Sequence, residues 1–196
     1  MNYLGHAYLS FGEPEIIVGN MISDFVKGKT RFGYTVNIQK GIMLHRDIDQ
    51  YTDTHPVIKK AKELFRSDYR LYSGAVVDVI LDHFLAKDDA AFGEEGLMTF
   101  TKQVYDTLDG YKEHLPTRFQ AIFPYMKRDN WLYHYSSLDG ISRSLNGLVQ
   151  RAVYLEDYKP AVTILKAHYR FLESCYKDFI PDVKDFAKSQ LERRSL

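Results

Sequence analysis

Residues 74–86, Gly-Ala-Val-Val-Asp-Val-Ile-Leu-Asp-His-Phe-Leu-Ala, decide the fold class of this chain. Their apolar side chains cover nearly every side of a helix, and apolar residues recur at helical intervals almost throughout the sequence. Clean alternation of apolar and polar residues, which is typical of strands, is scarce. A helix that is apolar all round belongs in the centre of a protein. The pattern therefore predicts an all-α fold built around residues 74–86.

Proline and glycine breakers divide the rest of the chain into further helices, and no long linker separates them. We therefore expect a single compact multi-helix domain over residues 1–196. The last helix is expected to be broken or kinked at Pro181, because proline lacks an amide donor. The predicted helices cover residues 3–11, 14–26, 37–53, 56–65, 74–86, 96–113, 117–127, 137–152 and 161–194.

The composition limits the classes of partner. The 196 residues are 45% hydrophobic, which is enough for a real core, and 26 basic residues balance 26 acidic ones. A chain with zero net charge is not expected to bind nucleic acid or an anionic membrane over its whole surface. The single cysteine, Cys175, forms no internal disulfide, and the sequence shows neither a signal peptide nor a membrane span. We expect a cytoplasmic protein.

Polar residues occupy helical positions where the pattern calls for apolar ones. Asp24 lies within an apolar helix, and His45 and Asp49 are four residues apart, so they project from one helical face. Asp78 and Asp82 repeat that spacing inside the central helix, and His83 follows directly. The sequence thus places several carboxylates and imidazoles where burial is expected.

A divalent metal resolves the charge problem that these carboxylates pose. Burying an ionised carboxylate costs several kcal/mol unless a cation or a dense set of donors compensates. A metal neutralises several ligands at once, and Mn²⁺ suits mixed imidazole and carboxylate ligands best, with Mg²⁺ or Fe²⁺ as alternatives. Such a metal binds a phosphate oxygen and activates water, which indicates hydrolysis of a phosphoester.

Simpler interpretations remain open at this point. A His–Asp pair such as His45 and Asp49 is common as a surface hydrogen bond, and Asp82 with His83 is compatible with a helix-end charge beside a core histidine. His6 on a short apolar helix is usually a satisfied core residue. The whole chain would then be a helical binding module without catalysis.

Four blocks of sequence, in order, resemble bacterial acyl carrier protein phosphodiesterases. The blocks are Met-Asn-Tyr-Leu-Gly-His at residues 1–6, Gly-Asn-Met-Ile-Ser-Asp-Phe-Val-Lys-Gly at 19–28, Gly-Ile-Met-Leu-His-Arg-Asp-Ile-Asp at 41–49 with Thr52-Asp53, and Asp-Val-Ile-Leu-Asp-His-Phe-Leu at 78–85. The resemblance implies an all-helical relative of the HD-domain phosphohydrolases. No His-Asp dipeptide occurs, and the adjacent pair is reversed as Asp82-His83, which matches the modified motif of the carrier protein enzymes.

The resemblance also implies an activity and a set of site residues. The expected reaction is Mn²⁺-dependent cleavage of the phosphodiester that joins 4′-phosphopantetheine to a serine of holo-acyl carrier protein. Asp24, His45 and His83 are the expected catalytic residues, and Asn20 and Asp78 are expected to support the ligands. The expected metal ligands are His6, Asp24, His45, Asp49, Asp82 and His83.

The substrate protein in this family is acidic, and the sequence contains a basic region that could meet it. Ten basic residues and five acidic ones lie between Lys27 and Arg70. The expected substrate-binding residues are Lys27, Lys29, Arg31 and Arg46. The same region could instead serve a metal-dependent phosphohydrolase of a nucleotide or another small phosphoester, or be an ordinary solvated surface.

Overall fold

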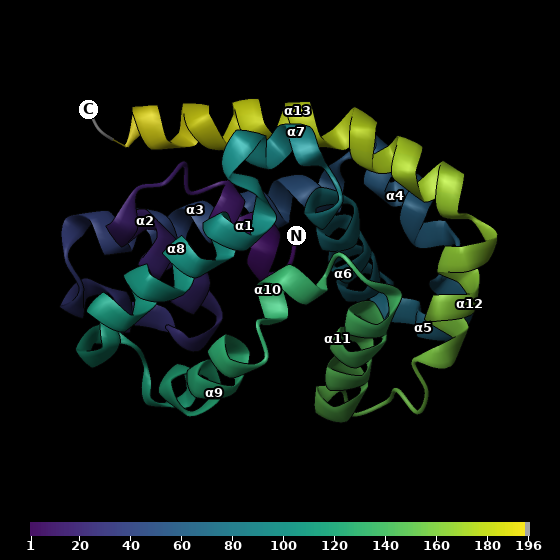
Figure 1. Cartoon of the computed structure of the whole chain (residues 1–196), viewed down its shortest axis with the longest axis horizontal. Coiled ribbons are helices and arrows are strands. Elements are labelled where there is room, and N and C mark those ends of the chain that lie inside the picture. The colour runs from purple at the N-terminus through teal and green to yellow at the C-terminus, as the bar shows by residue number, and fades with distance from the viewer. Residues whose placement is uncertain (195–196) are drawn as a thin grey trace.

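The apolar run at residues 74–86 forms helix α6 (Ser73–Ala86), and this helix lies at the centre of the molecule. Eleven of its side chains are buried, from Ser73 to Ala86. It packs against α1, α4, α11 and α13, which come from both ends of the chain (Figure 1). The prediction of a central, all-round apolar helix is confirmed.

The computed structural model describes residues 1–194, and these residues contain thirteen α-helices and no strand. The predicted all-α fold is confirmed, while the predicted domain also includes residues 195–196, which lie outside the described residues. The α-helices are α1 (Tyr3–Tyr8), α2 (Pro14–Ile22), α3 (Val36–Thr54), α4 (Pro56–Glu63), α5 (Arg66–Tyr69), α6 (Ser73–Ala86), α7 (Asp89–Phe92), α8 (Gly96–Gly110), α9 (Thr117–Arg128), α10 (Trp131–His134), α11 (Leu138–Arg151), α12 (Lys159–Ala167) and α13 (Tyr169–Arg193). Short 3₁₀ segments are η1 (Ser23–Phe25), η2 (Gly28–Gly33), η3 (Arg70–Tyr72), η4 (Gly93–Glu95) and η5 (Lys112–His114).

The C-terminal helix differs from the expectation in where it breaks. The predicted helix over 161–194 is two helices, α12 and α13, separated at His168. Pro181 lies inside α13 without ending it, and Figure 1 shows that α13 bends along its length. Loss of one amide donor bends a well-packed helix more readily than it ends one. The other long helices match their predicted ranges to within a few residues, and the short helices α5, α7 and α10 were not predicted.

Helices α2 and α3 approach each other closely at two glycines. A Cβ atom added at Gly19 would lie 2.1 Å from the carbonyl oxygen of Ile38, and one at Gly41 would lie 2.5 Å from that of Ile16. Only glycine leaves room for this contact between the two backbones. The approach brings the backbone of Asn20 within reach of side chains on α3, which matters for the site described below.

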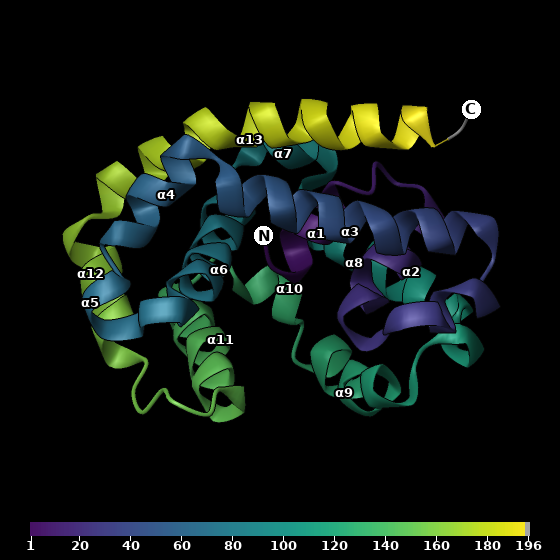
Figure 2. The same cartoon turned by 180° about the vertical axis from the view of Figure 1, so that it is seen from behind.

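The remaining helices enclose this centre. Helix α13 lies along α3 and α4 on one edge of the molecule, and α9 and α10 face α11 on the opposite edge (Figures 1 and 2). The buried apolar side chains form one cluster that runs from Met1 to Ala187. None of the helices in the described residues combines the length and the apolar character that crossing a bilayer requires.

Candidate metal centre

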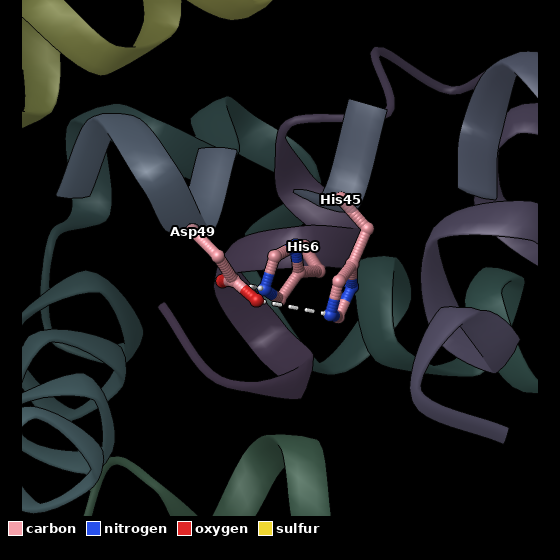
Figure 3. A group of neighbouring side chains, drawn as sticks. All are labelled: His6, His45 and Asp49. Carbon is pink, nitrogen blue, oxygen red and sulfur yellow. Dashed lines mark hydrogen bonds and ion pairs between the residues drawn. The ribbon is translucent and has the colours of Figure 1, made fainter. Parts of the chain in front are cut away.

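Three side chains from two helices converge beside the start of the chain. His6 comes from α1, and His45 and Asp49 come from adjacent turns of α3. Each offers one ligand atom within 4.8 Å of the others, and Figure 3 shows the carboxylate of Asp49 directed at both rings. The two imidazole rings are stacked, with centroids 3.8 Å apart. Among the predicted metal ligands, the structure brings these three together.

Asn20 orients both imidazoles. Its side-chain amide donates to the carbonyl oxygen of His6 and to the hydroxyl of Ser10, so its Oδ1 is the acceptor that faces His6 Nδ1 at 2.9 Å. The backbone carbonyl of Asn20 faces His45 Nδ1 at 2.8 Å. Both oxygens only accept, so the Nδ1 atoms of His6 and His45 carry the hydrogen. Asn20 thus contacts both imidazoles, and its role in supporting metal ligands stays a prediction.

The second nitrogen of each ring faces a carboxylate. His6 Nε2 lies 3.1 Å from Asp49 Oδ1, and His45 Nε2 lies 3.2 Å from both Asp49 Oδ2 and Asp24 Oδ1. A neutral imidazole that donates from Nδ1 has a lone pair on Nε2, and a carboxylate cannot donate to it. Consistently, His45 Nε2 is a buried nitrogen that completes no hydrogen bond within the described residues. A cation between these atoms satisfies the nitrogens and the carboxylates together, so the residues present fit a metal.

Protonation values follow from the same contacts. Burial and the neighbouring His45 lower the pKa of His6 to about 4. Burial opposes the charge on His45 as well, but its contacts with Asp24 and Asp49 outweigh burial and raise its pKa to about 9. The contact with His45 lowers the pKa of Asp24, and the two imidazoles hold the pKa of Asp49 far below its usual range despite burial. A proton on His45 Nε2 thus occupies the position that a metal would take, and the two compete.

The cluster opens into a cavity of about 250 Å³. Asp24, with 72% of its side chain exposed, lies at the open side of the cluster, whereas His6 and His45 are buried. The cavity is also lined by Tyr3 of α1 and by Arg151, the last residue of α11. Neither residue was among the predicted site residues, although Tyr3 lies in the block at residues 1–6. Arg151 lies in the C-terminal half, which has no motif of its own, and only the folding of α11 onto α6 brings it here.

Asp82 and His83 do not join the cluster, because protein groups already bind their polar atoms. The carboxylate of Asp82 accepts hydrogen bonds from the amides of Asn2, Leu4 and Gly5 at 2.8–3.2 Å, which anchors the first turn of α1. His83 Nδ1 donates to the carbonyl of Tyr135 at 2.7 Å.

The other ring nitrogen of His83 is also bonded, since its Nε2 lies 3.1 Å from the Tyr169 hydroxyl. His83 is buried, and burial lowers its pKa. The contacts of Asp82 and His83 therefore give no support to the prediction that they are ligands, or that His83 is catalytic. Both side chains form hydrogen bonds within the protein, and their role as ligands stays a prediction.

Asp78, predicted to support the ligands, lines the cavity and accepts a hydrogen bond of 2.8 Å from the amino group of Met1. Burial raises the pKa of Asp78, and the Met1 amino group offsets part of that rise. Asp78 thus contributes to the cavity wall, and its carboxylate is paired with the Met1 amino group.

Three of the predicted basic residues, Lys27, Lys29 and Arg31, follow Asp24 closely in sequence. Lys27 and Lys29 are exposed, and Arg31 lies over the ring of Phe32 at 4.8 Å. Arg46 is half-buried and donates to the carbonyl of Val26 at 2.9 Å, so it ties the start of this segment to α3. We call residues 27–33 the basic loop.

Comparisons with known proteins identify the family of this chain. The family described as acyl carrier protein phosphodiesterase matches residues 1–183. A relative of that name from Yersinia pestis is 34% identical over 182 residues, covering 92% of this chain and 94% of its own. One from Enterobacter sp. (strain 638) is 33% identical over 191 residues, covering 97% and 99%. No solved structure matches significantly. This chain belongs to the acyl carrier protein phosphodiesterase family.

Proposed function

We propose that this chain is a metal-dependent phosphodiesterase that removes 4′-phosphopantetheine from the serine of holo-acyl carrier protein. The relatives carry the name of that activity. The observation that supports a metal-dependent reaction is the pair of fixed imidazoles, each with Nε2 directed at Asp49. The kinship with HD-domain enzymes remains a prediction of the sequence.

His6, His45 and Asp49 would hold the metal, with Asp24 as a further ligand at the open side. Mixed imidazole and carboxylate ligands suit Mn²⁺, with Mg²⁺ or Fe²⁺ as alternatives. When bound, a divalent ion neutralises the phosphodiester oxygens and makes a water more acidic. Asn20 keeps both rings in the tautomer that directs Nε2 to the metal, a role that supporting residues commonly play.

The reaction itself is a displacement at phosphorus. The oxygen of water forms a bond to phosphorus, the bond between phosphorus and the serine oxygen breaks, and that oxygen leaves with the proton that the water gives up. Asp24 is the group that we assign to accept the proton of the attacking water, because its exposed carboxylate meets both the cluster and the solvent. The products are the carrier protein with a free serine hydroxyl and 4′-phosphopantetheine.

The basic loop is the surface that we assign to carrier-protein docking. It begins three residues after Asp24 and presents Lys27 and Lys29 to solvent. Phe32, which follows them in sequence, is 60% exposed. Complementary charges raise the rate at which an acidic protein associates, and this effect weakens as salt increases. A local patch of this kind is compatible with the zero net charge of the whole chain.

Mass spectrometry of holo-acyl carrier protein after incubation with the Mn²⁺-loaded protein tests the proposal. We expect the carrier protein to lose the phosphopantetheine mass and to become apo-protein. Unchanged holo-protein together with cleavage of a nucleotide phosphodiester would instead establish the alternative of a small phosphoester substrate.

Charge reversal tests the docking surface. Lys27→Glu with Lys29→Glu should lower kcat/KM for the carrier protein about ten-fold or more and flatten its dependence on salt. Lys59→Glu with Lys60→Glu is the matched control, because it changes the net charge equally on exposed residues of α4. Equal losses in both variants would contradict docking at the basic loop.

A further inference from the structure

A second cavity adjoins the metal cluster, and the function of the chain stated so far does not use it. Its volume is about 290 Å³, at the lower end of the roughly 300–1,000 Å³ of small-molecule sites. Helices α9 and α10 form one side, and α11 forms the other, as they stand opposite each other in Figures 1 and 2. We call it the α11 cavity.

A single face of α11 lines this cavity. The lining residues of that helix are Gly140, Arg143, Ser144, Gly147 and Arg151. Their steps of three, one, three and four residues keep them on one side of a helix. A Cβ atom built on Gly147 meets nothing within 4 Å, so a side chain at this position would have open space.

The lining outside α11 combines aromatic residues with the polar residues Asn2, Asp129 and His134. The aromatic residues are Tyr3, Trp131 and Tyr135, and Ile122 of α9 lies beside them in the lining. Tyr135 is buried, and the carbonyl of Tyr135 accepts the hydrogen bond from His83 described above. Asp82 fixes the amides of Asn2 and Leu4 on either side of Tyr3. The adjacent residues Asp82 and His83 on α6 thus position two parts of the cavity wall, which gives this pair a use beyond stability.

The α11 cavity adjoins the cavity of the metal cluster. Asn2, Tyr3 and Arg151 line both. Burial raises the pKa of the Tyr3 hydroxyl, and the Arg151 guanidinium, which hydrogen-bonds to it, offsets part of that rise. A permanent positive charge therefore lies where the two cavities meet.

We propose that the α11 cavity holds the pantetheine arm of the substrate while Arg151 binds the phosphodiester at the junction. This inference rests on the proposed function, and it assigns a binding site to the part of the substrate that leaves. An arginine at the junction suits a phosphate, because its planar guanidinium can donate two parallel hydrogen bonds to phosphate oxygens. The aromatic residues of the lining suit the uncharged chain beyond the phosphate.

Trp131 gives a direct readout, since it is the only tryptophan in the sequence. Titrating the full-length protein with 4′-phosphopantetheine should change Trp131 fluorescence in a saturable way. Pantetheine, which lacks the phosphate, should bind more weakly to the same site. Arg151→Gln should reduce the affinity for 4′-phosphopantetheine at least ten-fold. The affinities of this variant for 4′-phosphopantetheine and for pantetheine should therefore differ less than those of the wild type. A flat fluorescence signal with both probes would overturn the inference.

Filling the cavity provides the second test. Gly147→Leu should lower the affinity for both probes at least ten-fold and lower the turnover of holo-carrier protein relative to that of a small phosphodiester, bis(4-nitrophenyl) phosphate. Gly110→Leu is the matched control, because Gly110 also lies in a helix, has open space at its Cβ position and does not line the cavity. Circular dichroism checks that both variants fold.

The outcomes separate this inference from the proposed function. If the protein cleaves holo-carrier protein and Gly147→Leu binds the probes and turns over substrate as Gly110→Leu does, the α11 cavity is not the site of the arm. If the protein cleaves no carrier protein, the proposed function fails. In that case, saturable probe binding that Gly147→Leu removes would still support a pantetheine site in the cavity.

Discussion

The cluster of His6, His45 and Asp49 and the pair Asp82 and His83 are built from the same residue types on apolar helices, but their surroundings differ. In the cluster, the Nε2 atoms of both imidazoles face carboxylate oxygens, which cannot donate to them, so these contacts need a cation between them, either a proton or a metal. On α6, the carboxylate of Asp82 accepts hydrogen bonds from three backbone amides, and the two ring nitrogens of His83 are hydrogen-bonded to a carbonyl and a hydroxyl. A buried carboxylate or imidazole indicates a metal only where the protein leaves it without a complementary partner.

The largest expected effect comes from substituting the cluster. Asp49→Asn keeps the size of the side chain and removes its charge, so the two imidazoles lose their anionic neighbour. We expect metal content, measured by elemental analysis of the purified protein, to fall below one tenth of the wild-type value. Turnover of carrier protein should fall at least about 100-fold, beyond the range typical of supporting residues.

Asp82→Asn is the matched substitution in the other region. It should leave the metal content unchanged, because the carboxylate of Asp82 is bound to amides of α1. Loss of metal from Asp82→Asn with retention by Asp49→Asn would reverse the comparison and restore Asp82 as a ligand.

A smaller effect is expected at Asn20, which touches both rings but not the metal. Asn20→Ala removes the acceptor of His6 Nδ1 and keeps the backbone carbonyl that faces His45. We expect metal affinity to fall about 10–100-fold, the usual range for groups that orient ligands, when measured by calorimetry. Ser10→Ala removes an acceptor of the Asn20 amide and a donor to the backbone carbonyl of His6, but no partner of either imidazole, so it is the control and should lower affinity much less. Equal losses would mean that Asn20 acts through packing alone.

The sequence predicted the fold more fully than the site, and the reason is physical. Helical spacing records which face of a helix is buried, so the central position of α6 could be derived from residues 74–86 alone. Spacing also placed His45 and Asp49 on one face of α3. What spacing does not record is the partner of each polar atom. Asp82 reads as a ligand in sequence, but its amide partners lie 77–80 residues away.

Arg151 illustrates the opposite case, a cavity residue that the pattern did not indicate. It stands in a polar stretch at the end of α11 with no motif around it, and only the packing of α11 on α6 brings it to the cavity. The break at His168 in place of Pro181 has the same origin, because packing along α3 and α4 supports α13 through its proline. Tertiary contacts thus decided the features that local pattern could not.

A modest loss of stability, without loss of metal, is expected from Asp82→Ala. The variant leaves the amides of Asn2, Leu4 and Gly5 without their acceptor, but it also removes a carboxyl that is costly to bury. We expect the free energy of unfolding in urea to fall by about 1–2 kcal/mol. A variant as stable as the wild type would show that water replaces the carboxylate at the start of α1.

The last prediction is a pH dependence that separates the two regions. Burial raises the pKa of Asp82 to about 7 in the folded protein, with the Met1 amino group and the three amides opposing it. In the unfolded chain, the pKa of an aspartate is about 3.9. Between these values the unfolded chain releases a proton that the folded protein keeps, so this group stabilises the fold less as pH rises.

Unfolding in urea measures this pH dependence, with a chelator present to remove any metal contribution. The stability advantage of wild type over Asp82→Ala should shrink from about pH 4 to about pH 7. The carboxylates of the cluster have lowered pKa values and act with the opposite sign, but they are common to both proteins and cancel in the difference. An advantage that grows with pH would mean that the three amides hold Asp82 ionised, and that its environment resembles the cluster more than its contacts indicate.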